Sequence, residues 1–230
     1  MAGEVIQVLE IARRVSAQSD GLFDITVADQ LVACGHLPAM HTVESAALPA
    51  VGASWEDVVL SADEHVIFRR PLLIDLGGIA KGFAVDLALR ICKQAGPLLR
   101  AARINAGGDL ARFGQTDTAI QIRHPINTSH LLNIDCGNHV AVATSAYEYN
   151  NPMHITPAGF SEPPRFASAT VIASSCVIAD ALTKVVMLDA TGNIAARCLE
   201  HFEASAVVID RQGKVQRSSM QAAQREHAYA

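Results

Sequence analysis

Residues 74–82, with the sequence IDLGGIAKG, are the part of the chain best suited to bind an anion. A candidate buried strand at 72–76 leads into Gly77 and Gly78, and a helical pattern then runs from about Ile79 to Gln94. Glycines let a ligand approach the backbone, and the first turn of a helix offers free N–H groups and a partial positive charge. Lys81 adds a full charge in that turn, where the helix dipole disfavours one. The pattern indicates a phosphate site, and the alternative is a glycine turn beside a solvated lysine.

A second group of polar residues lies on one face of a helix predicted to start after Ser174 or Ser175 and to end near Leu188. Asp180, Thr183 and Lys184 share this face because steps of three and four residues return to the same side of a helix. One interpretation is an exposed ion pair between Asp180 and Lys184. The other is a site for a hard cation such as Mg²⁺, which binds one or two carboxylates together with phosphate oxygens. From the residue types alone, the exposed ion pair is favoured.

Three further segments hold residues that take part in chemistry in other proteins. His154, ahead of a proline-rich loop, has the side chain of a general base near neutral pH, although a lone loop histidine more often has no chemical role. Residues 105–109, NAGGD, read as a tight turn after a strand. Thr144 and Ser145 lack the Gly-x-Ser-x-Gly context of a serine hydrolase.

The hydrophobic periodicity predicts an α+β fold of one domain or two intimate subdomains. We expect helices at 4–17, 79–94 and 176–188, a hairpin at 58–68, and further strands that are mostly antiparallel. These strands are predicted at 103–105, 109–113, 119–122, 139–144, 169–173 and 207–210. Polar residues 216–230 are expected to form a loose tail.

Charge and composition argue against several classes of protein. Eighteen Lys and Arg residues stand against 23 Asp and Glu residues, which gives a net charge of -5 and no lysine-rich run. Nucleic acid is therefore not an expected partner. Five widely spaced cysteines indicate reduced thiols. The N-terminus has no apolar signal core and the chain no transmembrane segment, so we expect a cytoplasmic protein, or a periplasmic one if an export segment is missing.

Five motifs follow one another in an order typical of a single protein family. They are SDGLFDITV at 19–27, DLGGIAKGFAVD at 75–86, NAGGD at 105–109, ATS at 143–145 and ADALT at 179–183. From about residue 4 to residue 210, the chain resembles the ApbE family of FAD:protein FMN transferases. The resemblance implies a single ApbE-like domain over 1–215, with antiparallel or mixed sheets and flanking helices.

The same resemblance implies a reaction and its participants. FAD would be the substrate, Mg²⁺ would be required, and FMN would pass to a Thr or Ser hydroxyl of an acceptor protein with release of AMP. The resemblance implies that Lys81 and Asp86 lie along the FAD site, that Ala80 and Asp180 are metal ligands, and that His154 lies in the family's histidine-containing loop. The candidate site residues are then Gly77, Gly78, Lys81 and Asp86 for FAD, Ala80, Asp180 and Thr183 for the metal, and His154 and Lys184 for catalysis.

Several positions depart from the family pattern. Family members usually begin with a further segment that carries a Met-Gly-Thr motif, and their helix has threonine four residues after the aspartate. Here that position is Lys184, and Thr183 comes one residue earlier. The loop His-x-x-Asp-Pro appears as HITP at 154–157, and Trp-Gly-Phe appears as CGH at 34–36. Two hypotheses follow: an active transferase in which Lys184 replaces one function of the metal, or a non-catalytic relative that binds FAD or the acceptor.

Overall fold

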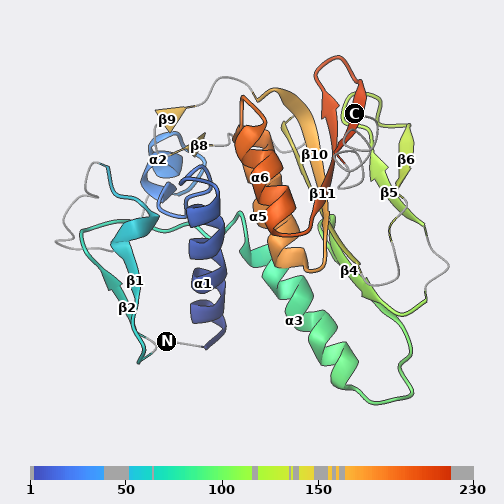
Figure 1. The fold of residues 1–230 in the computed structure, drawn as a ribbon, viewed down its shortest axis with the longest axis horizontal. Helices are drawn as coiled ribbons and strands as arrows, with labels where there is room; N and C mark the ends of the chain where they lie inside the picture. The colour runs from blue at the N-terminus through green and yellow to red at the C-terminus, as the bar shows by residue number, and fades with distance from the viewer. Residues whose placement is uncertain are drawn as a thin grey trace, which may run out of the picture.

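The computed structural model confirms the predicted α+β fold. It describes residues 3–38, 52–63, 65–115, 119–134, 136, 140–147, 155–156, 159–160 and 164–218. Its largest sheet has six strands in the order β12-β11-β10-β7-β4-β3, and every neighbouring pair is antiparallel (Figure 1). The strands are β3 (Ala102–Ala106), β4 (Asp109–Phe113), β7 (Val140–Ala146), β10 (Phe166–Ala173), β11 (Ser205–Asp210) and β12 (Val215–Ser218).

Three two-stranded ribbons and several helices surround this sheet. The ribbons pair β1 (Val58–Leu60) with β2 (Val66–Phe68), β5 (Ile120–Arg123) with β6 (Leu131–Ile134), and β8 (Ile155–Thr156) with β9 (Gly159–Phe160). The helices are α1 (Gly3–Gln18), α2 (Ala28–Ala33), α3 (Ala80–Gln94), α5 (Cys176–Leu188) and α6 (Asn193–His201), with a short 3-10 turn at Trp55–Asp57.

Helix α5 is buried on almost all sides, as expected for a helix that is apolar around most of its circumference. It packs against β7 and β10 and is flanked by α1, α3 and α6 (Figure 1). The sheet residues beneath it include Ala143, Ala169 and Val171. Small side chains on the sheet let the helix backbone come close, so polar side chains of α5 have little access to solvent.

The opposite face of the sheet has a core of its own. Successive side chains of a strand point to opposite faces, so Val142 turns away from α5 while its neighbours face it. With Leu110 and Val207 it packs against Ile120 and Ile134 of the β5–β6 ribbon. The sheet therefore separates a helical layer from a smaller layer of strands (Figure 1).

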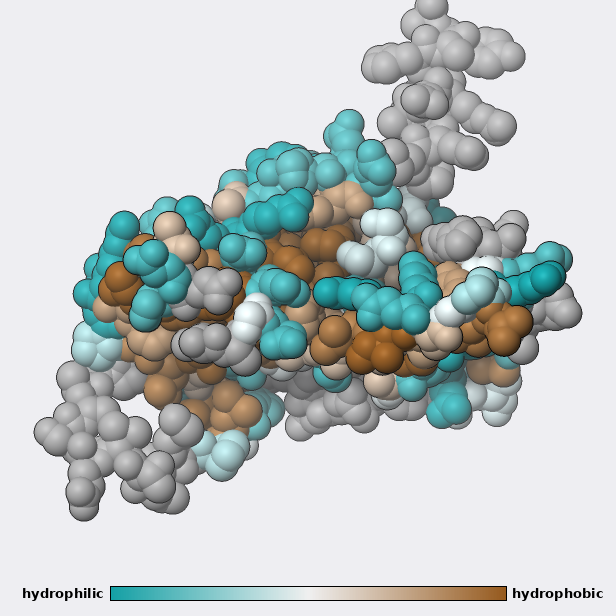
Figure 2. Space-filling view, turned by 90° about the horizontal axis from the view of Figure 1, so that it is seen from below, coloured by the Kyte–Doolittle hydropathy of each residue, from teal (hydrophilic) through white to brown (hydrophobic). Residues whose placement is uncertain are grey.

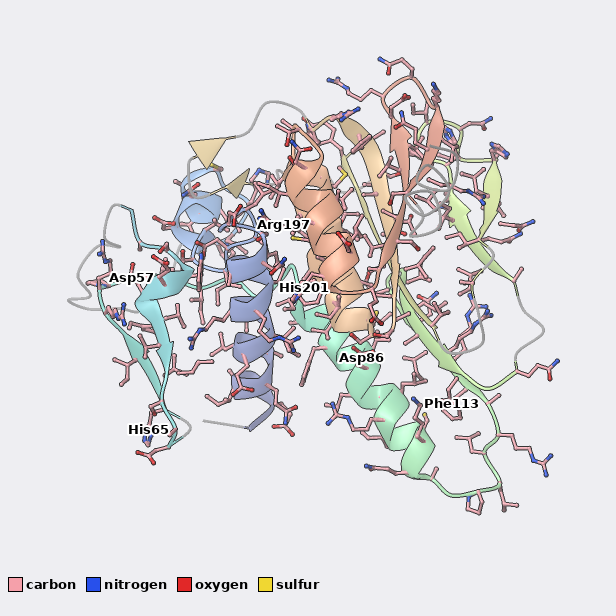
Figure 3. All side chains as sticks on the ribbon, in the orientation of Figure 1. Asp57, His65, Asp86, Phe113, Arg197 and His201 are labelled. Atoms are coloured by element: carbon pink, nitrogen blue, oxygen red, sulfur yellow. The ribbon has the colours of Figure 1, made fainter. Side chains whose placement is uncertain are left out.

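The predicted elements and the observed ones differ in several places, and α2, β6, β8 and β9 are among the elements that were not predicted. Residues 72–76 are not a strand: they lie outside the ladders, and the Asp75 N–H donates to the Ile25 carbonyl at 2.8 Å. Helix α6 was not predicted either, and Arg197 on α6 contacts Gln18 at the end of α1 and Asp20 in the turn that follows (Figure 3). Residues 216–218, expected in a loose tail, pair with β11 as part of β12.

Seen from below, the surface shows hydrophobic residues in several places between hydrophilic ones (Figure 2). Among the described residues, the strongly exposed large hydrophobic side chains include Ile91 in α3 and Leu98 just after that helix. Within the same described ranges, no helix has both the length and the apolar character needed to cross a membrane.

Candidate functional site

Four charged side chains from three separate motifs meet where α3 begins. The ammonium of Lys81 lies 2.6 Å from the carboxylate of Asp109 and 3.4 Å from that of Asp180. Lys184, one turn after Asp180 on α5, donates to the same carboxylate and, at 3.1 Å, to the Asp180 backbone carbonyl. The two carboxylates and the two ammonium groups form one cluster, which we call the Asp180 cluster.

Asp180 is buried, which corrects the expectation of an exposed ion pair. Its side chain is 1% exposed and that of Lys184 is 16% exposed, whereas Lys81 at the edge of the cluster is 55% exposed. The i,i+4 spacing is the same for exposed and buried pairs, so spacing alone cannot distinguish them. Burial follows from the position of α5 between the sheet and the other helices.

Gly82 lets α3 approach α5 closely enough for this contact. A Cβ at Gly82 would lie 2.3 Å from the Cys176 carbonyl oxygen and 2.9 Å from the Asp180 Cβ. Because that space is free, the Gly82 N–H reaches a carboxylate oxygen of Asp180 at 3.1 Å. The glycine of the IAKG sequence thus lets the two helices pack closely and lets its own N–H reach Asp180.

The predicted glycine turn lies against the outer carbons of the Lys184 side chain, next to its ammonium. A Cβ on Gly78 would be 3.4 Å from the Lys184 Cε and 3.4 Å from the ring of Phe23. Gly77 donates its N–H to the Asp75 carboxylate at 3.0 Å. The glycine turn and Asp180 therefore lie on either side of the Lys184 side chain.

Thr183 is also buried, and its hydroxyl is already hydrogen-bonded. It lies 2.7 Å from the Asp180 carbonyl, to which it donates, and 2.7 Å from the hydroxyl of Ser145 on β7. Ser145 belongs to the ATS motif, for which the sequence analysis assigned no role. The contact shows why that motif faces α5.

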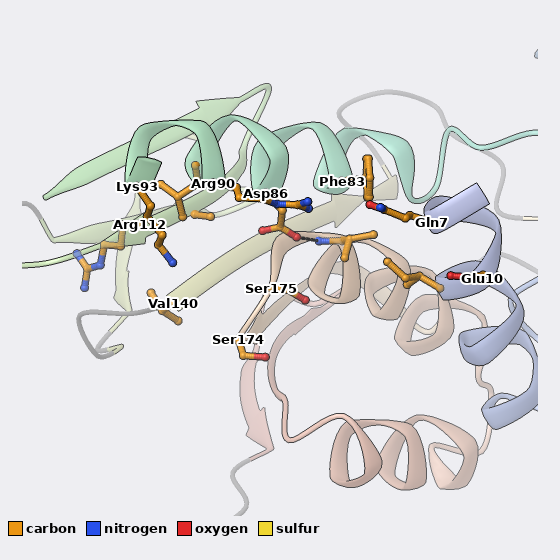
Figure 4. Close-up of a pocket in the computed structure, with 14 residues that line it drawn as sticks. Gln7, Glu10, Phe83, Asp86, Arg90, Lys93, Arg112, Val140, Ser174 and Ser175 are labelled. Carbon is orange, nitrogen blue, oxygen red and sulfur yellow. Dashed lines mark hydrogen bonds between the residues drawn. The ribbon is translucent and has the colours of Figure 1, made fainter. Parts of the chain in front are cut away.

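Asp86 caps α5. Its two carboxylate oxygens accept the backbone N–H groups of Cys176 and Val177, each at 2.9 Å (Figures 3 and 4). Ser175 stands at the N-cap position, as predicted, but its side chain makes no capping hydrogen bond. The carboxylate of α3 replaces the capping side chain that a serine usually supplies.

Pockets lie on both sides of the sheet. One of about 480 Å³ contains Asp86, with Arg90, Lys93 and Ser174 among its other lining residues (Figure 4). Another of about 420 Å³ lies on the face opposite α5. It is lined in part by Asn105, Gly107 and Gly108 of the NAGGD turn, and by Thr144.

The electrostatics of the Asp180 cluster keep its outer lysine charged. Burial works to lower the pKa of Lys81, but the charges of Asp180 and Asp109 outweigh it and raise that pKa. Burial raises the pKa of Asp109, with a further contribution from the neighbouring charge of Asp180. Burial lowers the pKa of Lys184, and the attraction of Asp180 opposes that shift.

Comparison with known proteins assigns the chain to a family. A model of the ApbE family matches residues 1–208. The chain belongs to the ApbE family. No curated protein sequence matches it. In this ApbE family member, DLGGIAKG leads into the first turn of α3, NAGGD spans the β3–β4 turn and ADALT lies on α5.

Solved structures of ApbE proteins share this fold. The ApbE protein of Thermotoga maritima is 23% identical, with a TM-score of 0.75, and the match covers 97% of this chain and 78% of that one. A mutant of the flavin transferase ApbE from Vibrio cholerae is 22% identical, with a TM-score of 0.77 and coverages of 97% and 77%. The apo flavinyl transferase ApbE of Pseudomonas stutzeri is 21% identical, with a TM-score of 0.75 and coverages of 98% and 74%.

The ligand oxygens around Asp180 do not fit the Mg²⁺ ion that the resemblance implies. Mg²⁺ requires near-octahedral oxygen ligands at about 2.0–2.1 Å. The Asp180 oxygens already accept N–H groups from Gly82 and Lys184, and the Thr183 hydroxyl is committed to the Asp180 carbonyl. Among the residues that the structure describes, no group of three or more acidic, His or Cys side chains could hold a metal. The Asp180 cluster is therefore filled by hydrogen-bond donors of the chain itself and not arranged for Mg²⁺.

The predicted site residues fall into three groups. Gly77, Gly78, Ala80, Lys81, Asp180, Thr183 and Lys184 gather around the start of α3 and the middle of α5. Asp86 lies instead at the beginning of α5, and His154 lies outside the described residues. Asp109 was read only as part of a turn, although its place in the NAGGD motif was the signal that could have identified it.

Proposed function

We propose that this ApbE family member binds FAD and transfers FMN to a Thr or Ser hydroxyl of an acceptor protein, with release of AMP. The observation that supports this most strongly is the position of Lys81. Its ammonium bridges Asp109 and Asp180, so three family motifs that are distant in sequence converge on one half-exposed cation. The flavin transferases among the structural relatives have the same fold.

The diphosphate of FAD would lie beside the glycine turn at the start of α3. Gly77 is exposed there, and the N-terminal turn of a helix favours negative charge. Lys81, 55% exposed, offers its ammonium to a phosphate oxygen while its inner contacts hold it in place. Charge-assisted hydrogen bonds of this kind are about twice as strong as neutral ones.

The transfer itself exchanges the phosphoanhydride bond of FAD for a phosphate ester bond to the acceptor. The acceptor oxygen would attack the phosphorus of the FMN half, the anhydride bond between the two phosphates would break, and AMP would leave with that bridging oxygen. The hydroxyl proton would pass to a base, for which His154 is the proposed residue. Positive charge near the anhydride stabilises the charge that develops as the bond breaks.

The remaining predicted residues would act by positioning. Asp86 holds the start of α5 and so fixes the helix that carries Asp180. Thr183 and Ser145 connect that helix to β7. The proposed reaction uses no Mg²⁺, because the oxygens of Asp180 and Thr183 do not fit this ion. The acceptor protein, the cytoplasmic location and the extent of the domain over residues 1–215 stay predictions.

The test combines FAD binding with product analysis. The purified protein is incubated with FAD and a flavin-accepting protein domain that carries a target threonine; the same domain with Thr→Ala is the control. We expect AMP, measured by chromatography, and acceptor-bound flavin, measured by in-gel fluorescence, in equal amounts. Tight FAD binding without either product would instead support the non-catalytic alternative, and absence of FAD binding would refute the proposal.

Lys81→Met gives a sharper version of the test. Loss of one ammonium from the diphosphate site should weaken FAD binding by roughly tenfold or more, the usual worth of a charge-assisted hydrogen bond. Lys93→Met is the matched control, because Lys93 lies in the last turn of the same helix. Its FAD affinity should stay within about twofold of the wild type. Equal effects of the two variants would argue against a diphosphate at Lys81.

A further inference from the structure

Lys184 occupies the position at which a metal ion would have to bind Asp180. Its ammonium contacts both the carboxylate and, at 3.1 Å, the main-chain carbonyl of that residue. The other carboxylate oxygen accepts the Gly82 N–H at 3.1 Å, and the Thr183 hydroxyl donates to the carbonyl at 2.7 Å. A metal ion would therefore have to displace hydrogen-bond donors that already contact Asp180.

The charge balance of the Asp180 cluster makes this displacement unfavourable. The carboxylates of Asp109 and Asp180 are matched by the ammonium groups of Lys81 and Lys184. With an uncharged residue at 184, the same cluster would carry one excess negative charge and would attract a cation. With Lys184 present, a divalent ion would meet an ammonium at close range in a poorly solvated site, where repulsion is only weakly screened.

Packing holds the lysine in this position. The Lys184 side chain is 16% exposed, and its Cδ and Cε lie 3.7 and 3.4 Å from the place a Cβ on Gly78 would occupy. The missing side chain of Gly78 thus provides the space that the lysine stem fills. The ammonium stands between the glycine turn and Asp180, close to the proposed position of the diphosphate.

We propose that the ε-ammonium of Lys184 replaces a divalent metal ion at Asp180, so that this protein binds FAD without any divalent cation. Lys184 supplies one fixed positive charge that compensates Asp180 and faces the phosphates. The statement about FAD rests on the proposed function above. The statement that Asp180 does not bind a metal depends only on the contacts of Lys184.

The first experiment measures Mn²⁺ binding without FAD, from the loss of the electron paramagnetic resonance signal of the free ion. Wild type, Lys184→Thr and Lys214→Thr are compared; Lys214, in the turn before β12, is the matched control. We expect Lys184→Thr to bind Mn²⁺ at least about tenfold more tightly than the other two, because one nearby ammonium has been removed. One tightly bound Mn²⁺ per wild-type chain, or equal binding by all three proteins, would overturn the proposal.

The second experiment needs no variant, so it remains decisive if Lys184→Thr does not fold. FAD affinity of the wild type is measured by flavin fluorescence in EDTA and in excess MgCl₂. We expect the two dissociation constants to agree within about twofold, since the compensating charge is part of the chain. A loss of tenfold or more in EDTA would overturn the proposal. If the wild type binds no FAD in either buffer, the proposed function fails, and the Mn²⁺ titration still decides the role of Lys184.

Discussion

The carboxylate of Asp86 on α3 receives the first two free N–H groups of α5, those of Cys176 and Val177, each at 2.9 Å. Free N–H groups at the start of a helix need acceptors, and here the acceptor comes from another helix. The contact joins α3, which carries Lys81, to α5, which carries Asp180 and Lys184. The same contact therefore stabilises the fold and helps to fix the geometry of the Asp180 cluster.

Replacing Asp86 should reveal its contribution to stability. We expect Asp86→Ala to lower the free energy of unfolding by about 1–3 kcal/mol, because a cap is lost and two N–H groups at a buried helix end lose their acceptor. Ser175→Ala is the control, since Ser175 occupies the N-cap position without a side-chain cap. Its effect should be below about 0.5 kcal/mol. Urea unfolding followed by circular dichroism measures both, and a larger loss for Ser175→Ala would contradict the assignment of the cap.

Gly82 should tolerate no side chain. The Cβ of alanine would lie 2.3 Å from the Cys176 carbonyl oxygen, a backbone atom that cannot move without shifting α5. We expect Gly82→Ala to cost about 3 kcal/mol or more, at the upper end of overpacking effects. Gly3→Ala is the control, because nothing lies within 4 Å of a Cβ at that position. Thermal unfolding should show a clear decrease in Tm for the first variant only. Similar Tm values would mean that α3 and α5 are not this close.

Cys198 should make the protein less stable at alkaline pH. Burial raises the pKa of this thiol from 9.0 to about 11, so the folded state holds the proton more tightly than the unfolded state. Unfolding then releases a proton between those two values, and stability falls as pH rises through them. The loss attributable to this thiol approaches roughly 2–3 kcal/mol above the upper value, at about 1.4 kcal/mol per pH unit.

The matching measurement compares urea unfolding of wild type and Cys198→Ala at several pH values from 8 to 11. The stability of the wild type should fall more steeply with pH than that of the variant, whatever the cost of the substitution at neutral pH. Cys176, which is also buried, is present in both proteins, so its contribution cancels in the comparison. Parallel pH curves would show that Cys198 is not the group that titrates.

Much of the fold could be read from local patterns. The helices at 3–18, 80–94 and 176–188 follow from hydrophobic spacing, and the β3–β4 hairpin follows from two strand-like segments around Gly107 and Gly108. Local patterns also misled: residues 72–76 are apolar enough for a strand but have no ladder partner. An apolar run is typical of a segment that packs on the protein, but it does not show whether that segment pairs in a sheet, and residues 72–76 are only half-buried.

The candidate site could be predicted in part. The order of its motifs identified Lys81 and Asp180, and both lie in the cluster. The sequence does not show that the Asp86 carboxylate caps the start of another helix. The role of Gly82 in bringing α3 against α5 likewise depends on a contact between segments far apart in the chain.

The sequence by itself determined the fold class, the family motifs and the presence of a lysine four residues after Asp180. Only the tertiary structure decided that this pair is buried, that Lys81 joins it to Asp109, and that the Lys184 stem fills the space left by Gly78. The physical reason is that residue spacing along a helix specifies which side chains are neighbours. Whether those neighbours meet water, a charge or another backbone depends on the elements that pack against the helix.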